Sequence, residues 1–498
     1  MITVSTMLAV IMQALDTTIA NVALPHMQGS LQSSQDQIAW VLTSYIVAVA
    51  IATPLAGWLC GRWGRRRVFL VAVVGFTAAS ALCGLAMNLW EMVSARLLQG
   101  VFGAALVPLS QAVMLDINPK EKVGQAMAVW GAGIMVGPIF GPILGGWLTE
   151  HADWRWVFFI NLPVGVLAFY GIARYLPESR PPGERLDLFG FAMLSLGVGL
   201  LQLCLDRGAQ LDWFNSIEIR LEAAGCVVAL AYFVVHTWTS TGASFLDREL
   251  LRDRNFVTGC VCVAVLGAIM YATMALLPSL LQGVLGYPVV VVGEVTAPRG
   301  LGMMLTMIMV GRVMHRVDGR ALMACGFALN AYSLYQMTHI TLDMDTDLVV
   351  LSGFVQGIGL GMSFVPLTTI AFATLAPRLR NGGTPIYSLM RNIGSSVGIS
   401  LVQMLYTEGA ARSHAGLASD ITPYNPVLQG LPPMLDAATP AGLAALNIEV
   451  TRQAAMMAYV ADFHVMMLVT LAALPLLLFI RKPGGGAVSD GPVADAAH

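Results

Sequence analysis

The sequence predicts an all-α polytopic membrane protein with fourteen transmembrane helices, arranged as two six-helix bundles plus two inserted central helices. Hydrophobic residues make up 57% of the 498-residue chain and charged residues only 11%, roughly half the charged share of a soluble protein. Apolar stretches long enough to cross ~30 Å of hydrocarbon recur along the whole chain. In addition, two short sequence patterns recur far apart in the chain, which indicates an internal repeat.

Windows of about 20 mainly apolar residues identify the individual spans. An even number of spans places both termini on the same side of the membrane. The predicted spans are 3–24, 38–59, 68–87, 91–115, 124–147, 156–176, 188–205, 218–238, 256–280, 289–311, 321–340, 348–374, 383–406 and 457–480.

The distribution of basic residues predicts the orientation. If the N-terminus is cytoplasmic, nineteen of the 27 Lys and Arg residues fall in inner loops, five in outer loops and three within spans. This is the bias that the positive-inside rule describes. Both termini are therefore predicted to be cytoplasmic.

The internal repeat sets the domain organisation. Residues 57–63 match 311–317 at an offset of 254, and Gln99-Gly100 match Gln356-Gly357 at an offset of 257. Because the first six spans end near residue 176, such offsets indicate either eight spans per period or two six-span bundles with spans 7 and 8 between them. Parallel six-span repeats are a transporter arrangement.

We therefore expect four parts along the chain. They are an N-terminal six-helix bundle at 1–176, the inserted helices at 177–255, a C-terminal six-helix bundle at 256–480 and a disordered cytoplasmic tail at 481–498. A Pro-containing segment within the C-terminal bundle, at 407–456, is predicted to be a long extracytoplasmic loop.

Span 5 contains a stripe of glycines at every fourth position, on one face of a helix. We call Gly133, Gly137, Gly141 and Gly145 the glycine stripe. Pro138 and Pro142 each remove a helical hydrogen bond, while small residues let a neighbouring backbone approach closely. The stripe predicts a bendable helix against which another bundle moves, although membrane helices are in general richer in Gly and Pro.

Ionisable residues within spans are functional candidates, because burying them is costly without a partner. Asp16 and Arg96 lie at similar depths, about 12 Å and about 10 Å from the outer ends of their spans at the helical rise. An ion pair is therefore predicted. The arginine favours an ionised Asp16, whereas burial favours a protonated one. The pair therefore suits a proton switch, which water is expected to reach from the outer side. The alternative is a purely structural ion pair.

Other polar residues within spans are weaker candidates. Glu294 comes next after Asp16 for proton coupling or for binding a cationic substrate, with snorkelling to the interface as its alternative, and Asp462 is expected to be interfacial. The remaining candidates are residues of a candidate substrate cavity. They are Gln99, Gln356, Arg299, Arg391 and Asn392. For the two arginines the alternative is a second proton site, and for the three amides it is helix-to-helix hydrogen bonding.

Several kinds of site are not expected. The three lysines, Lys120, Lys122 and Lys482, do not form a phosphate-binding loop, so the energy source is an ion gradient and no cofactor is predicted. No metal site, disulfide framework or nucleic-acid partner is predicted. A membrane enzyme or sensor is a remote alternative, because neither a nucleophile–base constellation nor a signalling domain is visible.

Six sequence motifs, in order, resemble the 14-span drug:proton antiporter branch of the major facilitator superfamily (the EmrB/QacA type). They are 15–25, 96–105, 137–146, 154–165, 277–288 and 391–398. The resemblance covers essentially the whole chain. It implies a proton-coupled multidrug efflux transporter of the bacterial inner membrane, which exports amphipathic, cationic or lipophilic compounds by alternating access.

The resemblance also implies roles for two motifs. The glycine stripe, with Pro138, Pro142 and Gly146, corresponds to the antiporter motif. The loop after span 2 corresponds to a cytoplasmic latch through Gly57, Arg62, Gly64, Arg65 and Arg66. Gly61 stands where the latch normally has an acid, so we expect Asp116 to pair with Arg65 or Arg66, unless these arginines serve only topology.

The implied partners are small amphipathic substrates, protons and the lipid bilayer. A periplasmic adaptor and an outer-membrane channel remain open as further partners. A dedicated exporter of a single metabolite or fatty acid on the same scaffold is the main alternative function.

Overall fold

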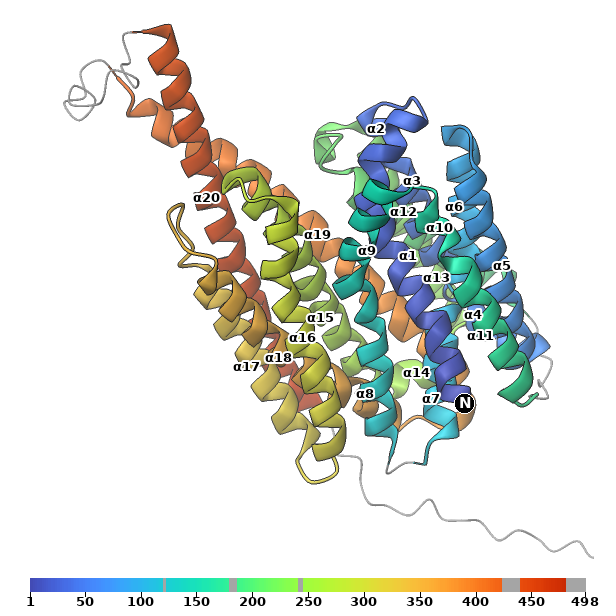
Figure 1. The fold of residues 1–498 in the computed structure, drawn as a ribbon. Helices are drawn as coiled ribbons and strands as arrows, with labels where there is room; N and C mark the ends of the chain where they lie inside the picture. Colours follow the sequence, from blue (N-terminus) through green and yellow to red (C-terminus); the bar gives the residue numbers. More distant parts are fainter. Residues whose placement is uncertain (120–121, 179–185, 241–244, 423–438, 481–498) are drawn as a thin grey trace, which may run out of the picture.

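The computed structural model describes residues 1–119, 122–178, 186–240, 245–422 and 439–480, which form helices and connections without a β-strand (Figure 1). Each predicted span coincides with one helix or with consecutive helices. The N-terminal half contains α1 (Ile2–Ser30), α2 (Gln35–Ile38), α3 (Trp40–Ala52), α4 (Leu55–Trp63), α5 (Arg65–Leu85), α6 (Leu89–Gly103), α7 (Leu106–Ile117), α8 (Val123–Ile134), α9 (Val136–His151), α10 (Trp156–Phe159) and α11 (Asn161–Tyr175).

The remaining helices form the inserted segment and the C-terminal half. The inserted segment contains α12 (Leu188–Arg207), η2 (Trp213–Asn215), α13 (Ile217–Thr239) and α14 (Arg248–Arg252). The C-terminal half contains α15 (Arg254–Ser279), η3 (Leu280–Val284), α16 (Val289–Val313), α17 (Gly319–Met337), α18 (Asp347–Ala373), η4 (Pro377–Leu379), α19 (Arg380–Ser419), α20 (Pro440–Ala473) and η7 (Leu474–Phe479).

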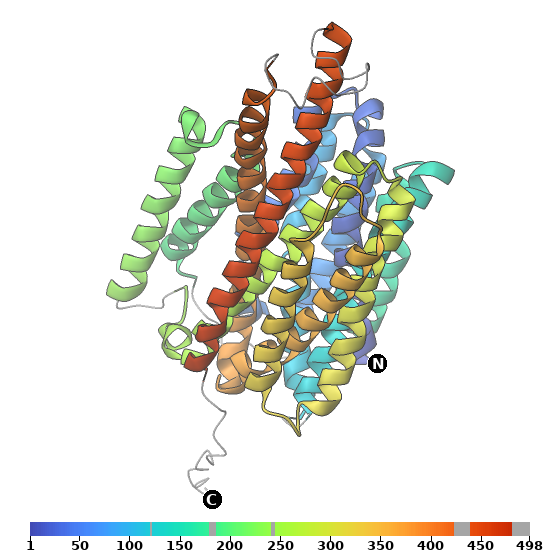
Figure 2. The same cartoon turned by 90° about the vertical axis from the view of Figure 1, so that its left-hand side faces the viewer.

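Length and hydropathy identify most of these helices as membrane-spanning. In the described part of the chain, nine spans meet both criteria, or ten if α3 and α4, which bend by 52°, count as one. Four more long helices, α13, α16, α17 and α19, run alongside them (Figure 2). The passage of all fourteen through a bilayer stays a prediction.

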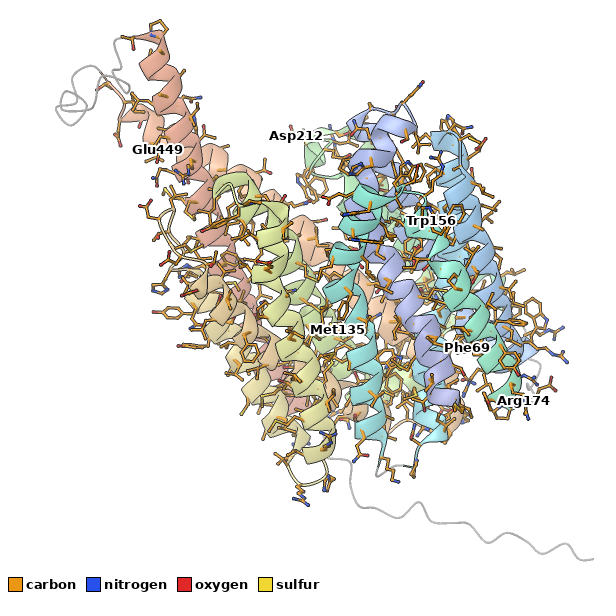
Figure 3. All side chains as sticks on the ribbon, in the orientation of Figure 1. Phe69, Met135, Trp156, Arg174, Asp212 and Glu449 are labelled. Atoms are coloured by element: carbon orange, nitrogen blue, oxygen red, sulfur yellow. The ribbon has the colours of Figure 1, made fainter. Side chains whose placement is uncertain are left out.

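Prolines explain two of the helix breaks. The bend between α3 and α4 falls at Thr53–Pro54. Helix α8 ends at Ile134, four residues before Pro138, which has no N–H to donate to the Ile134 carbonyl. Met135 separates α8 from α9 and is labelled in Figure 3. The predicted bendable helix of span 5 is therefore broken near its middle.

The two halves repeat the same packing. In the N-terminal half α1 packs on α9, α3 on α6, and α5 on both α6 and α11; in the C-terminal half α15 packs on α19, α16 on α18, and α17 on both α18 and α20. Helices α12 and α13 pack on each other, and α12 also contacts α3 and α19. This pattern confirms two six-helix bundles with two inserted helices.

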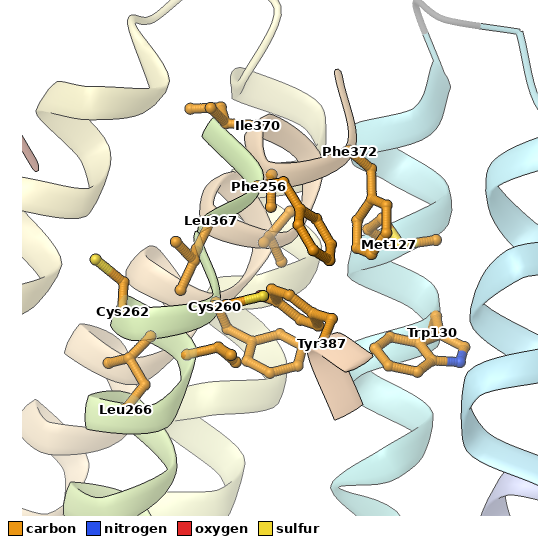
Figure 4. Packing of buried hydrophobic residues seen from close by; sticks show 14 of the residues in the cluster. Met127, Trp130, Phe256, Cys260, Cys262, Leu266, Leu367, Ile370, Phe372 and Tyr387 are labelled. Atoms are coloured by element: carbon orange, nitrogen blue, oxygen red, sulfur yellow. The ribbon is translucent and has the colours of Figure 1, made fainter. Parts of the chain in front are cut away.

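The bundles meet at the end of the molecule that carries α7, α8 and α14, and they diverge toward the end that carries α2 (Figure 1). Trp130 of α8 stacks on Phe364 of α18, with ring centroids 6.2 Å apart. Met127 and Trp130 face Phe372 and Tyr387 across this contact (Figure 4), and all belong to one hydrophobic cluster. By the predicted orientation, the closed end is cytoplasmic.

The segment predicted as a long loop, 407–456, is largely helical. Helix α19 continues to Ser419 and α20 begins at Pro440, and both stand beyond the other helices, as Glu449 shows in Figure 3. The loop prediction was wrong because the chain has no proline between Thr407 and Pro423 to stop α19. The predicted tail, 481–498, lies outside the described residues.

Candidate functional site

The predicted contact between Asp16 and Arg96 lies at the centre of a buried polar cluster. Arg96 Nη1 donates to Asp16 Oδ2 at 2.7 Å. Gln99 Nε2 and Asn161 Nδ2 each donate to Asp16 Oδ1 at 2.8 Å. We call these four residues the Asp16 cluster. Three donors from α6 and α11 thus converge on one carboxylate of α1.

The surroundings of Arg96 hold its guanidinium in place. Nη1 also donates to Gln99 Oε1 at 2.7 Å, and Nε donates to the Val41 carbonyl at 3.2 Å. The rings of Tyr45 and Phe158 lie 4.6 Å and 5.4 Å from the guanidinium carbon, which allows cation–π attraction. The arginine is therefore partnered on several sides.

Burial makes the cluster sensitive to the charge of Asp16. The side chains of Asp16 and Arg96 are 0% and 1% exposed. Removing one partner from such a pair leaves an uncompensated buried charge and typically costs about 3–5 kcal/mol. The expectation that water reaches Asp16 from the outer side does not hold in this conformation, because the packed helices and the rings around Arg96 enclose the carboxylate.

Two members of this environment were missed from the sequence. Asn161 also donates to Ser80 Oγ at 2.9 Å, and the Ser80 hydroxyl donates to the Phe158 carbonyl at 2.9 Å. Asn161 was visible as an uncharged polar residue within the motif at 154–165. The sequence gives no signal, however, that α11 would bring it to Asp16.

The predicted cavity residues do not form one site. Gln99 of α6 belongs to the Asp16 cluster and donates to Asp16 of α1, which is the helix-to-helix alternative for this residue. Gln356 Nε2 donates to Thr273 Oγ1 at 3.1 Å, while its own Oε1 is buried without a hydrogen-bond partner. Arg299 Nη2 donates to the Met270 carbonyl at 3.1 Å.

The two embedded arginines of the C-terminal half have no acidic partner. Within the described residues, neither Arg299 nor Arg391 lies within 4 Å of a carboxylate. Arg391 Nε is also buried without a hydrogen bond, and the neighbouring Asn392 is half-buried. Both arginines thus lie in the C-terminal half without an ion pair to any described carboxylate.

Glu294 takes no part in these contacts. Its side chain is exposed and makes no hydrogen bond or ion pair with the described part of the chain. It shares a helix face with Leu301 and Leu305, which are 43% and 58% exposed. This position favours the snorkelling alternative. Asp462, expected to be interfacial, is instead buried at 1% exposure, and its Oδ2 has no partner.

The glycine stripe packs against α1 of its own bundle. A β-carbon at Gly137 would lie 2.4 Å from the Ala14 backbone, and one at Gly141 would lie 2.0 Å from Thr18 Oγ1. Thr18 Oγ1 also donates to the Gly137 carbonyl at 2.9 Å. The expectation that the stripe faces a moving bundle was therefore wrong.

The outer members of the antiporter motif differ in their contacts. A β-carbon at Gly133 would meet Met7 and one at Gly145 would meet Val22, whereas Gly146 has open space around it. A different face of the broken helix, at Gly131, approaches Met307 of α16 in the other bundle. Span 5 is thus a bundle interface, but not through its glycine stripe.

The latch exists, and Asp116 supplies its acid. Asp116 accepts from Arg65 at 2.6 Å and from Arg380 of the C-terminal half at 2.9 Å. Arg65 also donates to Asn381 Oδ1, and a β-carbon at Gly57 would lie 2.8 Å from the Asn381 carbonyl. These contacts hold α4, α5 and α7 to α19.

The other latch residues have local roles. Gly64 ends α4 with a φ of 85°, a conformation that glycine adopts without strain. Arg66 donates to the Ala173 carbonyl and lies 3.5 Å from Glu178. Arg62 is exposed.

Outside the spans, Asp187 organises the start of α12. It accepts from the backbone N–H of Gly190 at 2.9 Å and of Phe245 at 3.1 Å, and His236 Nε2 lies 2.9 Å from it. Burial acts to raise the pKa of Asp187, but these hydrogen bonds outweigh it, so the pKa lies below its ordinary value. Among the described residues, no three His, Cys, Asp or Glu side chains converge as metal ligands.

Comparison with known proteins decides the family. The model described as "Major Facilitator Superfamily" matches residues 6–399. The chain belongs to the major facilitator superfamily. This superfamily consists of carriers, so the protein is a multi-pass membrane transporter and not an enzyme.

Relatives in the superfamily extend over most of the chain. "Multidrug export protein EmrB" of Escherichia coli (strain K12) is 36% identical over 432 residues, 86% of this chain and 84% of the relative. "Fatty acid resistance protein FarB" of Neisseria gonorrhoeae is 38% identical with the same coverage. These matches agree with the branch that the six motifs resemble.

Solved structures of the superfamily share the fold. The human organic anion transporter MFSD10 aligns with a TM-score of 0.61 at 15% identity, covering 94% of this chain and 98% of that one. The proton:xylose symporter XylE aligns with a TM-score of 0.59 at 13% identity, covering 95% and 94%. The predicted all-α major facilitator fold is therefore confirmed.

Proposed function

We propose that the protein is a proton-coupled efflux transporter for amphipathic compounds in the bacterial inner membrane, with both termini in the cytoplasm. The observation that carries this proposal is the buried Asp16 cluster, a titratable carboxylate held by three donors. Relatives named for multidrug export support the direction of transport. The proton gradient supplies the energy, and no cofactor takes part.

The cluster fits the ionised form of Asp16. Both carboxylate oxygens accept hydrogen bonds, and Arg96 needs the negative charge. A proton on Asp16 removes that charge and leaves the Arg96 cation buried without compensation. Protonation therefore favours a conformation in which Arg96 is hydrated or differently paired. A proton drives a cycle only if two conformations bind it with different affinity.

Helix α1 connects this cluster to the bundle interface. Asp16 lies between Ala14 and Thr18, the residues that pack on Gly137 and Gly141 from the opposite face of α1. Beyond the glycine stripe, α8 meets α16, with a β-carbon at Gly131 2.9 Å from Met307 Sδ. A shift of α1 on protonation thus acts on α9 through the close contacts at Gly137 and Gly141, and on the other bundle through the packing of α8 against Met307.

The test measures coupling and binding separately. Purified protein in proteoliposomes receives an imposed pH gradient, and export of ethidium is followed together with proton movement. Asp16→Asn is expected to abolish gradient-driven export while ethidium still binds, because asparagine is neutral at every pH. Glu294→Gln is the matched comparison and is expected to keep proton-coupled export.

Two results contradict this assignment. Normal proton-coupled export by Asp16→Asn removes Asp16 from the mechanism. Loss of coupling in Glu294→Gln, with coupling intact in Asp16→Asn, transfers the role to Glu294.

A dedicated fatty acid exporter is the second candidate. Arg299 and Arg391 have no acidic partner among the described residues, which favours a substrate with a carboxylate. The name of the relative FarB refers to fatty acid resistance. Adding oleate to the transport assay distinguishes the two, since export of oleate without ethidium supports the dedicated exporter. A periplasmic adaptor and an outer-membrane channel remain proposed partners, which co-purification from membranes tests.

A further inference from the structure

A second pocket lies outside the Asp16 cluster, where the inserted helix α12 meets the C-terminal bundle. Its volume is about 400 Å³, within the range of small-molecule sites. Four helices contribute to its wall: α12, α15, α19 and α20. Its polar and aromatic lining side chains include Asp206, Gln210, Ser279, Gln403, Tyr406 and Tyr459.

Asp206 gives this pocket a negative charge. It makes no ion pair with the described residues, although Arg207 follows it in the chain. The Arg207 guanidinium is already bonded to Glu218 and lies 5.2 Å from the ring centroid of Trp40. Among the described residues, the one hydrogen bond to the Asp206 side chain comes from the Thr43 hydroxyl of α3, at Oδ2. The carboxylate is thus available to a cation.

The opposite wall is aromatic. The rings of Tyr406 and Tyr459 lie 4.5 Å apart at 39° and join α19 to α20. Tyrosine rings attract cations that lie over their faces. Gln210, Ser279 and Gln403 add neutral polar groups.

We propose that this pocket binds an organic cation with aromatic substituents, paired with Asp206 and resting against Tyr406. The site is separate from the Asp16 cluster, and its existence does not depend on which residue couples the proton.

The pocket is connected to the proton-coupling region through α3. Thr43, which donates to Asp206, lies between Val41 and Tyr45, the two α3 residues that contact Arg96. A cation on Asp206 competes with the Thr43 hydroxyl for the carboxylate. Occupancy of the pocket therefore changes the packing of the helix that holds Arg96.

Equilibrium binding of tetraphenylphosphonium to the purified full-length protein at pH 8 tests the site. Asp206→Asn is expected to weaken the pocket's affinity at least about tenfold, since it removes the charge partner. Ser279→Trp fills the pocket without touching Asp206 and is expected to remove the same sites. Thr43→Val is expected to tighten binding, because it frees the carboxylate from its competing donor.

Two controls separate charge and pocket effects. Asp343→Asn removes an exposed acid elsewhere on the outer side and is expected to leave binding unchanged. Triphenylphosphine oxide, a neutral aromatic probe, is expected to bind equally to the parent and to Asp206→Asn. The number of sites per protein is measured as well, because sites on the transport path remain in both pocket variants.

Three results overturn the proposal. They are unchanged binding in Asp206→Asn, a loss in only one of the two pocket variants, and an equal loss of the neutral probe. None of them bears on the proposed efflux function, which fails if the parent protein shows no export of ethidium driven by the imposed pH gradient.

Discussion

The two halves of the molecule carry different side chains at matching positions. In the N-terminal half Gln99 donates to Asp16. An offset of 257 positions takes Gln99 to Gln356 and Asp16 to Thr273, and in the C-terminal half Gln356 donates to Thr273. At the same offset, Arg96 is replaced by Gly353. The hydrogen bond between the repeated helices is kept, but only the N-terminal half has an acid and a base at this point.

A second position reverses the placement of the arginine. Tyr45, whose ring lies over Arg96, corresponds at an offset of 254 to Arg299. The backbone contact is the same in both halves: β-carbons at Gly100 and Gly357 would lie 2.6 Å and 2.1 Å from the carbonyls of Tyr45 and Arg299. Arg299 turns to the Met270 carbonyl instead of a carboxylate.

The glycine contacts, in contrast, are present in both halves. Gly137 and Gly141 of α9 pack on α1, and Gly394 and Gly398 of α19 pack on the backbone of α15, with built β-carbons 2.1 Å and 2.6 Å from its atoms. Helix packing is thus duplicated while the charged chemistry is not. In the proposed function, proton coupling belongs to the N-terminal half, and the C-terminal half is free to specialise in substrate binding.

Making the N-terminal half resemble the C-terminal half tests this difference most strongly. Asp16→Thr leaves Arg96 buried without a counter-charge and is expected to lower the free energy of unfolding by about 3–5 kcal/mol. Adding Arg96→Met removes the charge at similar volume, so stability is expected to recover while coupled export stays lost. Thermal unfolding in detergent and proteoliposome transport measure the two effects.

The corresponding change in the C-terminal half is the control. Thr273→Val removes one neutral hydrogen bond and is expected to cost about 1 kcal/mol. If Asp16→Thr is no more destabilising than Thr273→Val, the two halves are energetically alike and the comparison fails.

The glycine contacts test what the halves share. Gly141→Leu is expected to destabilise by about 1–3 kcal/mol through overpacking and to abolish export, because α1 and α9 must separate. Gly398→Leu is expected to do the same in the C-terminal half. Gly146→Leu, on the same helix but in open space, is the control. Full activity of Gly398→Leu would show that only the glycine contact of the N-terminal half is required for export.

The latch tests the contact between the halves. Asp116→Asn loses the pairs with Arg65 and Arg380 and is expected to shift the closed-to-open equilibrium by about 1 kcal/mol, roughly fivefold. The closed-to-open equilibrium is measured as the alkylation rate of Met314→Cys at the C-terminal end of α16. The exposed Cys325 is replaced by Ser in this protein. Glu178→Gln breaks a pair within one half and should leave this rate unchanged.

The smallest expected effect concerns the inserted helices, which belong to neither half. The pKa of Asp187 is lowered on folding. Its contribution to the stability of the folded state is therefore complete above the unfolded pKa of about 3.9, and it is lost as the pH falls through the lower folded pKa. Hydrogen exchange at the start of α12 is therefore expected to show equal protection at pH 5 and pH 7. Weaker protection at pH 5 than at pH 7 would contradict the lowered pKa. Asp187→Ala removes the cap of α12 and is expected to lower the free energy of unfolding by about 1 kcal/mol.

Hydropathy and spacing predicted the spans, the repeat and the contact of Asp16 with Arg96, because depth along a helix is a one-dimensional property. The pairing of Asp116 with Arg65 or Arg66 was expected from the resemblance of the loop after span 2 to the family's latch. In contrast to depth, the direction in which a helix face points depends on the three-dimensional packing of the helices. The glycine stripe faces α1, Gln99 joins the cluster, and Glu294 is exposed, all because of rotations that neighbouring helices impose.

The partners Asn161 and Tyr45 were hidden for a related reason. Each is one uncharged residue in an apolar helix, and its meeting with Asp16 or Arg96 depends on the packing of several helices at once. Similarly, the helical continuation of α19 past residue 406 rests on the absence of a stop signal, which a hydropathy window does not register.

The uninterrupted length of α19 has a mechanical consequence. Its 40 residues span about 60 Å, roughly twice the hydrocarbon thickness, from Arg380 at the latch to the projecting end near Ser419. A rod of this length works as a lever, since a tilt of about 10° at its base displaces its tip by about 10 Å. If the latch opens and α19 tilts as one body, the displacement at its projecting end is therefore larger than the displacement at the latch.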